Sequence, residues 1–170
     1  ATEPESLDLN NKNRHAHIFV DEADKPDVTG VLLPSLFTHG DDTVDFINVL
    51  KGPYLDGTQY NALGGNDVVT LPVDSVDAAK AGYDSTHGFH GDDGSDSITG
   101  GLLDDIIFGD QGNDTLVGQN GADLLIGGRG DDQLNGGLDN DTLNGGDDAD
   151  FLSGDDGDDT VFGGAGFDQL

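Results

Sequence analysis

Aliphatic side chains recur every nine residues throughout the C-terminal half of the chain. Most of them stand between polar or aromatic neighbours, and the exceptions are Ile107, Leu116 and Leu125, so we expect each nine-residue unit to offer one side chain for burial. These residues are Ile98, Ile107, Leu116, Leu125, Leu134, Leu143, Leu152, Val161 and Leu170. Such a period predicts a stack of similar structural units rather than an ordinary globular core.

Two other places of the unit are invariant between residues 91 and 170. Gly holds the first place, at Gly91, Gly100, Gly109, Gly118, Gly127, Gly136, Gly145, Gly154 and Gly163. Asp holds the sixth place, at Asp96, Asp105, Asp114, Asp123, Asp132, Asp141, Asp150, Asp159 and Asp168. The fourth place is Gly except at Leu103, Asp139 and Asp148. The aliphatic described above holds the eighth place.

The unit divides into a glycine-rich turn and a strand of three residues, too short to be stable alone. Stacking would pair the strands in parallel and bury the aliphatics in a thin core. If each unit forms half a coil, eighteen residues close one turn, and alternate units lie above one another at roughly 4.8 Å. One predicted column then holds Asp96, Asp114, Asp132, Asp150 and Asp168, and the opposite column holds Asp105, Asp123, Asp141 and Asp159.

Stacked carboxylates at this spacing repel one another unless cations lie between them. Calcium accepts six to eight oxygen ligands at about 2.3–2.6 Å, so one ion between two stacked turns could take a carboxylate from each and carbonyls of the turns. Magnesium demands a stricter octahedron and retains its waters. The pattern therefore predicts calcium ions as partners of the repeat.

These residues resemble the hemolysin-type, or RTX, calcium-binding repeats of bacterial proteins exported by type I secretion. The resemblance implies an all-β fold, a right-handed parallel β-roll, with Ca²⁺ as the cofactor and a chain that folds only after export. It implies the nine sixth-place aspartates as side-chain ligands. The backbone carbonyls that it implies as further ligands belong to Gly91, Gly94, Gly109, Gly112, Gly118, Gly121, Gly127, Gly130, Gly136, Gly145, Gly154 and Gly157. Sites next to the three fourth-place exceptions are expected to be weaker or differently coordinated.

Composition narrows the classes of partner. Thirty-five acidic residues against six basic ones give a formal charge of −29, which excludes nucleic acid and anionic membrane surfaces as partners. The absence of Cys excludes disulfides and thiolate metal sites, and no apolar stretch is long enough to predict membrane insertion. No H-E-x-x-H motif, G-x-S-x-G motif or Cys nucleophile is present, so no enzyme activity is predicted.

Residues 1–90 have a more ordinary composition and are predicted to form a β-rich N-terminal region that caps the first coil of the 91–170 solenoid. Strands are expected at 18–20, 31–33, 44–49 and 68–73. The twenty-nine residues between Asp67 and Asp96 exceed one coil, so residues 74–90 should loop out, with a short helix over 76–81. Asp42 and Asp67 lie in turns that echo the repeat, and either calcium ligation or simple Asx turns would explain them.

Four histidines occur in closely spaced pairs, His15 with His17 and His87 with His90. Transition-metal binding is conceivable for such pairs, but ordinary surface histidines are the favoured interpretation.

Two functional classes fit the sequence. The first is a calcium-dependent module that aids secretion, folding and stability of a larger exported bacterial protein and engages a type I secretion apparatus. The second is a repeat segment of a calcium-dependent cell-surface adhesin or surface-layer protein. Both place the chain outside the cell, either secreted or at the cell surface, and the repeat is common to both.

Overall fold

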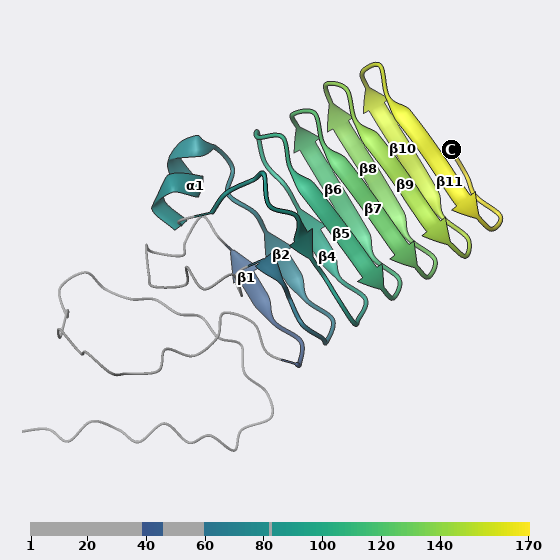
Figure 1. Ribbon diagram of the computed structural model, residues 1–170, viewed down its shortest axis with the longest axis horizontal. Coiled ribbons are helices and arrows are strands. Elements are labelled where there is room, and N and C mark those ends of the chain that lie inside the picture. Colours follow the sequence, from purple (N-terminus) through teal and green to yellow (C-terminus); the bar gives the residue numbers. More distant parts are fainter. Residues whose placement is uncertain (1–38, 46–59, 82) are drawn as a thin grey trace, which may run out of the picture.

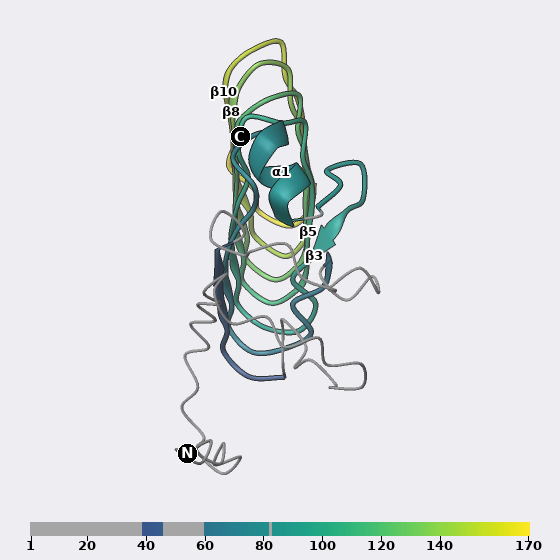
Figure 2. The ribbon, with the colours of Figure 1, turned by 90° about the vertical axis from the view of Figure 1, so that its left-hand side faces the viewer.

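The chain forms a parallel β-solenoid, seen here in a computed structural model that describes residues 39–45, 60–81 and 83–170. Its coils stack along one axis, with two facing sheets as the walls (Figures 1 and 2). One sheet has the order β1-β2-β4-β6-β8-β10 and the other β11-β9-β7-β5-β3. The first contains β1 (Thr43–Asp45), β2 (Val68–Thr70), β4 (Ser97–Thr99), β6 (Thr115–Asn120), β8 (Gln133–Leu138) and β10 (Phe151–Asp156). The second contains β3 (Phe89–His90), β5 (Ile106–Gln111), β7 (Leu124–Arg129), β9 (Thr142–Asp147) and β11 (Thr160–Ala165).

Neighbouring strands of each sheet are eighteen residues apart in the repeat. Leu116 in β6 pairs with Leu134 in β8, and Leu125 in β7 pairs with Leu143 in β9, all in parallel. Consecutive units therefore alternate between the two sheets. The predicted all-β class and the eighteen-residue coil are both confirmed.

The strands are longer than the three residues expected from the sequence. From β5 onward each has six residues and runs through the first-place Gly into the second and third places. In β7 the inward positions are Leu125 and Gly127, two residues apart as pleating requires. Because Gly127 has no side chain, this second inward-facing position adds nothing to the hydrophobic core. The turn is left with only the fourth to sixth places.

The core is a single file of side chains between the sheets. The eighth-place aliphatics from Ile98 to Leu152 are at most 2% exposed. Phe89 continues the file in the sheet of β5, while Val69 and Val44 continue it in the sheet of β4. Each coil thus buries about two core side chains, which is little for eighteen residues.

The stack extends upstream of Gly91. Val44 in β1 pairs with Val69 in β2, which pairs with Ile98 in β4. β1 overlaps the predicted segment 44–49 but begins one residue earlier, and β2 covers only the first three residues of the predicted segment 68–73. The predicted strands at 18–20 and 31–33, and residues 46–49, lie outside the described residues. A domain boundary near residue 91 stays a prediction.

The predicted helix lies between Asp67 and Asp96, but the predicted excursion over residues 74–90 is too long, because Phe89 and His90 form β3 in the second sheet. The helix α1 (Ser75–Ala81) lies beside the first coils of the stack (Figures 1 and 2). Asp74 begins it by accepting hydrogen bonds on Oδ1 from the N–H groups of Val76 and Asp77, at 2.8 and 3.0 Å. Ala78 packs against the core cluster. No helix in the described part of the chain has the length and apolar character needed to cross a membrane.

The thin core makes each eighth-place side chain important. We expect Leu125→Ala to lower the free energy of unfolding by about 2–5 kcal/mol, because it leaves a cavity in the file. Leu138→Ala removes the same atoms from a residue that is 45% exposed and should change stability by about 0.5 kcal/mol or less. Urea unfolding followed by circular dichroism at one fixed calcium concentration measures both. Equal losses would contradict a core confined to the eighth place.

Candidate metal centre: two columns of buried aspartates

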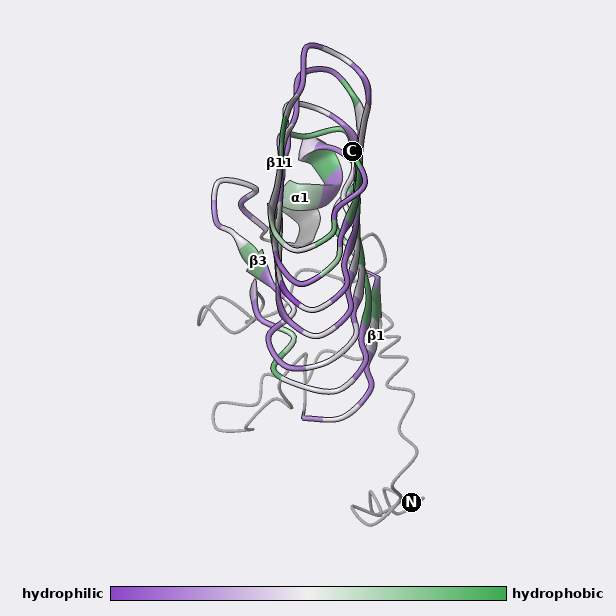
Figure 3. Cartoon of the chain, turned by 90° about the vertical axis from the view of Figure 1, so that its right-hand side faces the viewer, coloured by the Kyte–Doolittle hydropathy of each residue, from purple (hydrophilic) through white to green (hydrophobic). Residues whose placement is uncertain are grey.

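The sixth-place aspartates stack into the two columns that the sequence predicts. Seven of them lie between coils and are 1–2% exposed, from Asp96 through Asp150. Asp159 and Asp168, in the last coil, are partly buried. Each residue is the last of a three-residue turn at the edge of the solenoid, and its side chain is directed inward. Figure 3 shows hydrophilic colouring concentrated along these turns.

Each column is connected by backbone-to-carboxylate hydrogen bonds. The N–H of Asp96 donates to Oδ1 of Asp114, and the N–H of Asp114 donates to Oδ1 of Asp132, both at 2.8 Å. In the other column the N–H of Asp123 donates to Oδ1 of Asp141 at 2.8 Å. The carboxylate of one coil therefore satisfies a buried donor of the preceding coil.

The second oxygen of each buried carboxylate has no hydrogen-bond donor. In Asp105, the first of its column, Gly101 donates to Oδ2 at 3.0 Å and Oδ1 is the oxygen without a partner. In the other residues it is Oδ2, namely in Asp67, Asp96, Asp114, Asp123, Asp132, Asp141 and Asp150. A buried carboxylate that lacks partners is costly when ionised, so these oxygens call for a proton or a cation.

The first-place glycines explain how the free oxygens are accommodated. A Cβ at Gly127 would collide with Oδ2 of Asp132 and lie 2.6 Å from the carbonyl oxygen of Gly145. A Cβ at Gly109 would likewise collide with Oδ2 of Asp114 and lie 2.6 Å from the carbonyl oxygen of Gly127. These glycines lie in strands and have no positive φ, so the sequence-based assignment of their carbonyls to turns is wrong. Their Gly identity is required by space and not by backbone angle.

Four overlapping segments of the chain match the family model of the RTX calcium-binding nonapeptide repeat. The matches cover residues 90–125, 100–134, 108–143 and 135–170. Residues 90–170 are RTX calcium-binding repeats. This family binds calcium and belongs to secreted bacterial proteins. Comparisons with curated proteins and with solved structures gave no match.

Most fourth places of the RTX unit have an unusual backbone conformation. Gly112 has φ 129°, and a Cβ there would collide with the carbonyl oxygen of Gly94 in the preceding coil. Asp139 and Asp148, two of the exceptions, adopt φ 79° and 80°, so they keep the left-handed conformation at the cost that a side chain imposes. Leu103 is not among the residues of positive φ.

A second series of hydrogen bonds, between fifth-place residues of successive coils, was not predicted from the sequence. The N–H of Asp131 donates to Oδ1 of Asn113 at 3.2 Å, and the N–H of Ala149 donates to Oδ1 of Asp131 at 3.0 Å. The N–H of Asn113 donates to Oγ of Ser95 at 3.2 Å. The signal was present, because six of the nine fifth places are Ser, Asn or Asp. Their short side chains tie successive turns together on the exposed side.

The first column continues upstream of the RTX match. The N–H of Asp67 donates to Oδ1 of Asp96 at 2.8 Å, and the N–H of Asp42 donates to Oδ1 of Asp67 at 2.6 Å. Asp67 is 1% exposed and Asp42 is 7% exposed. Both residues thus occupy sixth-place positions, although the intervals between them differ from eighteen residues.

Burial raises the pKa of the column carboxyls. The chief cause is loss of water; the backbone N–H donors partly offset it, and neighbouring carboxylates such as Asp114 and Asp150 around Asp132 add to it. The pKa rises to about 6 for Asp96, Asp105 and Asp114, and to about 7 for Asp67, Asp123 and Asp132. The pKa values of Asp141 and Asp150 are raised for the same reasons.

The donor set fits calcium. Every buried donor-free group of the two columns is a carboxylate oxygen. Hard oxygen ligands are the ones that calcium prefers, and they hold softer metals poorly.

These pKa shifts predict an acid-stabilised fold in the absence of calcium. Unfolded aspartates titrate near 3.9, whereas the folded columns titrate at about 6–7, so the folded chain binds more protons between these values. The stabilisation is present in full below about pH 4 and is lost as pH rises through about 6–7. In the presence of a calcium chelator, circular dichroism should therefore show more β-structure at about pH 5 than at about pH 8. More β-structure at the higher pH would contradict the prediction.

Proposed function

We propose that this chain is a calcium-folded structural module in which the sixth-place aspartates of the RTX repeats hold calcium between stacked coils. The observation that carries the proposal is the set of buried carboxylate oxygens without hydrogen-bond donors, repeated in each coil. A calcium ion supplies the positive charge that these oxygens lack. Membership of residues 90–170 in a calcium-binding repeat family supports the same assignment.

The proposed ligands combine side chains and backbone. The nine sixth-place aspartates provide the carboxylates, and the fourth-place residues lie in the turns, where their carbonyl oxygens are close to the next coil. Gly94 and Gly112 are the nearest example, because the carbonyl oxygen of Gly94 lies where a Cβ of Gly112 would be. First-place carbonyls lie in the strands, so they are the weaker candidates. The exceptions Asp139 and Asp148 keep the turn conformation and with it the neighbouring sites.

Calcium binding and folding are expected to be one process. A single file of aliphatic side chains buries too little area to offset the backbone entropy of the coils and the repulsion between carboxylates. Binding free energy then becomes folding free energy. Because each interior ion would contact two coils, the transition should be cooperative.

This coupling suits an exported protein. In a cytoplasm poor in calcium the repeats would stay unfolded and could pass through the channel of a type I secretion apparatus. Extracellular calcium would then fold them, since extracellular modules bind at about 0.1–1 mM. We therefore propose a secretion, folding and stability role outside the bacterial cell, with no catalytic role for the repeats.

The decisive test is a matched pair of isosteric substitutions at adjacent residues. Asp132→Asn removes a charge and a metal ligand from a buried column but keeps an amide oxygen for the N–H of Asp114. It should raise the calcium midpoint of folding roughly 5–30-fold, the factor that corresponds to 1–2 kcal/mol. Asp131→Asn removes the same charge from the exposed fifth place and keeps its acceptor for Ala149. Far-ultraviolet circular dichroism during calcium titration compares the two with wild type.

The proposal fails if wild type has full β-structure in a chelator at neutral pH and calcium changes nothing. It also fails if both variants shift the midpoint equally, because the calcium dependence of folding would then reflect only the net charge of the chain. Magnesium should not replace calcium in the wild-type titration.

A second pair tests the upstream end of the column. Asp67→Asn should reduce the amount of bound calcium or its affinity, because Asp67 has the same buried, donor-free Oδ2 as the repeat aspartates. Asp41→Asn is the control, since Asp41 is exposed and accepts from the N–H of Asn66 through Oδ1, as a fifth-place residue does. Isothermal titration calorimetry with calcium measures both. Identical isotherms for wild type and Asp67→Asn would confine the sites to the RTX repeats.

A further inference from the structure

A second group of potential metal ligands lies on the outer face of the solenoid, and its members do not belong to the aspartate columns. His90 ends β3, Asp92 follows two residues later, and Asp110 is in β5. One ligand atom from each of the three residues lies within 4.8 Å of the other two. Among the described residues this is the only such group of three His, Cys, Asp or Glu side chains.

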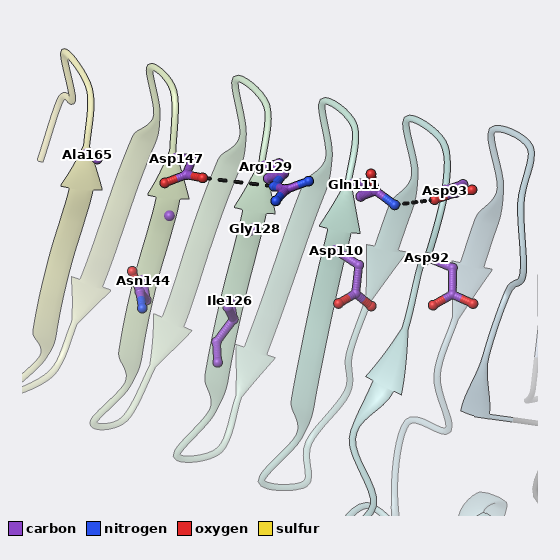
Figure 4. Close-up of a pocket in the computed structure, with 12 residues that line it drawn as sticks. Asp92, Asp93, Asp110, Gln111, Ile126, Gly128, Arg129, Asn144, Asp147 and Ala165 are labelled. Carbon is purple, nitrogen blue, oxygen red and sulfur yellow. Dashed lines mark hydrogen bonds and ion pairs between the residues drawn. The ribbon is translucent and has the colours of Figure 1, made fainter.

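The strand geometry accounts for the group. His90 and Asp92 flank Gly91 just after β3, and Asp92 has a left-handed backbone (φ 67°), as Asp110 does in the next coil (φ 73°). His90 pairs with Phe108 and Asp93 forms a parallel bridge with Gln111, so Asp110 lies beside Asp92 in the next coil. Figure 4 shows the carboxylates of Asp92 and Asp110 side by side and directed the same way.

The imidazole of His90 is held in place from two sides. Its Nδ1 lies 2.7 Å from Oδ2 of Asp110, and its ring stacks on that of Phe108 with a centroid distance of 4.4 Å and an angle of 5°. Phe108 is itself fixed over Gly88, because a Cβ at Gly88 would collide with its ring. The side chains of His90 and Asp110 are 41% and 35% exposed, so a metal ion has access.

The group is specific to this point of the stack. The equivalent outer positions of the next coil in the same sheet are Ile126 and Gly128, which offer no side-chain ligand. The cluster is therefore not part of the periodic RTX pattern, whose aspartates lie at the turns. It also contains a nitrogen donor, which the calcium columns lack.

We propose that His90, Asp92 and Asp110 form a binding site for a divalent transition metal ion such as Zn²⁺. Imidazole nitrogen selects zinc and related metals over calcium, while carboxylates supply charge. In a tetrahedral zinc site neighbouring ligand atoms are about 3.4 Å apart, so the 2.7 Å pair needs only a small opening. Three protein ligands leave one position for water.

Such an ion would join two adjacent coils. β3 is the edge strand of its sheet and contains two residues. A metal bound by His90 and Asp92 on one side and Asp110 on the other would fix this short strand to β5. The site thus reinforces the stack where the regular repeat begins.

The experiment is a zinc titration of the full chain in about 5 mM calcium, above the range in which extracellular modules saturate. Isothermal titration calorimetry should detect one zinc equivalent, and cobalt should give the visible absorption of a four-coordinate ion. His90→Gln should abolish this equivalent, and Asp110→Asn should weaken it at least about tenfold. His87→Gln and the double variant His15→Gln, His17→Gln should retain it. Circular dichroism in calcium checks that each variant is folded.

The proposal is overturned if folded wild type binds no zinc equivalent, if calcium displaces zinc, or if His90→Gln binds zinc as wild type does. Loss of the equivalent in the His15/His17 variant with retention in His90→Gln would also overturn it. The site depends on the fold and not on calcium ligation by the sixth-place aspartates. Failure of the calcium titration and failure of the zinc titration are therefore separate results.

Discussion

The fold depends on how two columns of buried carboxylates are neutralised. Stacking places an aspartate of each coil directly over the next at strand spacing, where repulsion is strong and water is excluded. Backbone N–H groups satisfy one oxygen of each carboxylate, for example Oδ1 of Asp132, but the other oxygen has no donor. Protons or metal ions must supply the missing charge. A chain that carries −29 charges and has six basic residues cannot supply it from its own side chains.

Other features of the repeat follow from this constraint. The first place is Gly because the free carboxylate oxygen occupies the space of its side chain, as Asp132 does at Gly127. The fourth place tolerates Asp139 and Asp148 because Asp can adopt a left-handed backbone at modest cost. The core has only one aliphatic per unit, packed between the two sheets.

The outer face of the solenoid is under much weaker constraint. Side chains there touch only neighbouring coils and solvent, so they can differ from coil to coil without disturbing the columns. A shallow groove of about 770 Å³ crosses this face of the β5–β7–β9 sheet (Figure 4). Gly128 and Gly146 line it and have no side chains to fill it. The cluster of His90, Asp92 and Asp110 lies on the same sheet, and the two carboxylates also line the groove. The side chains that depart from the repeat pattern in this sheet are therefore on the outer face rather than in the aspartate columns.

The sequence by itself determined the period, the eighteen-residue coil, the two aspartate columns and the single file of aliphatics. It could do so because in a regular repeat a fixed spacing along the chain becomes a fixed spacing in space. The helix near Val76 was also predictable, since twenty-nine residues between Asp67 and Asp96 exceed one coil. The steric role of Gly127 was not predictable, because it depends on where the carboxylate of Asp132 lies.

Only the tertiary structure decided what happens outside the regular spacing. Asp42 and Asp67 join the first column although the intervals from Asp42 to Asp67 and from Asp67 to Asp96 are twenty-five and twenty-nine residues, because β1, β2 and β4 pair in register. His90 meets Asp110 across twenty residues only because β3 pairs with β5. In these degenerate units no period relates sequence distance to position, so backbone pairing alone brings the residues together.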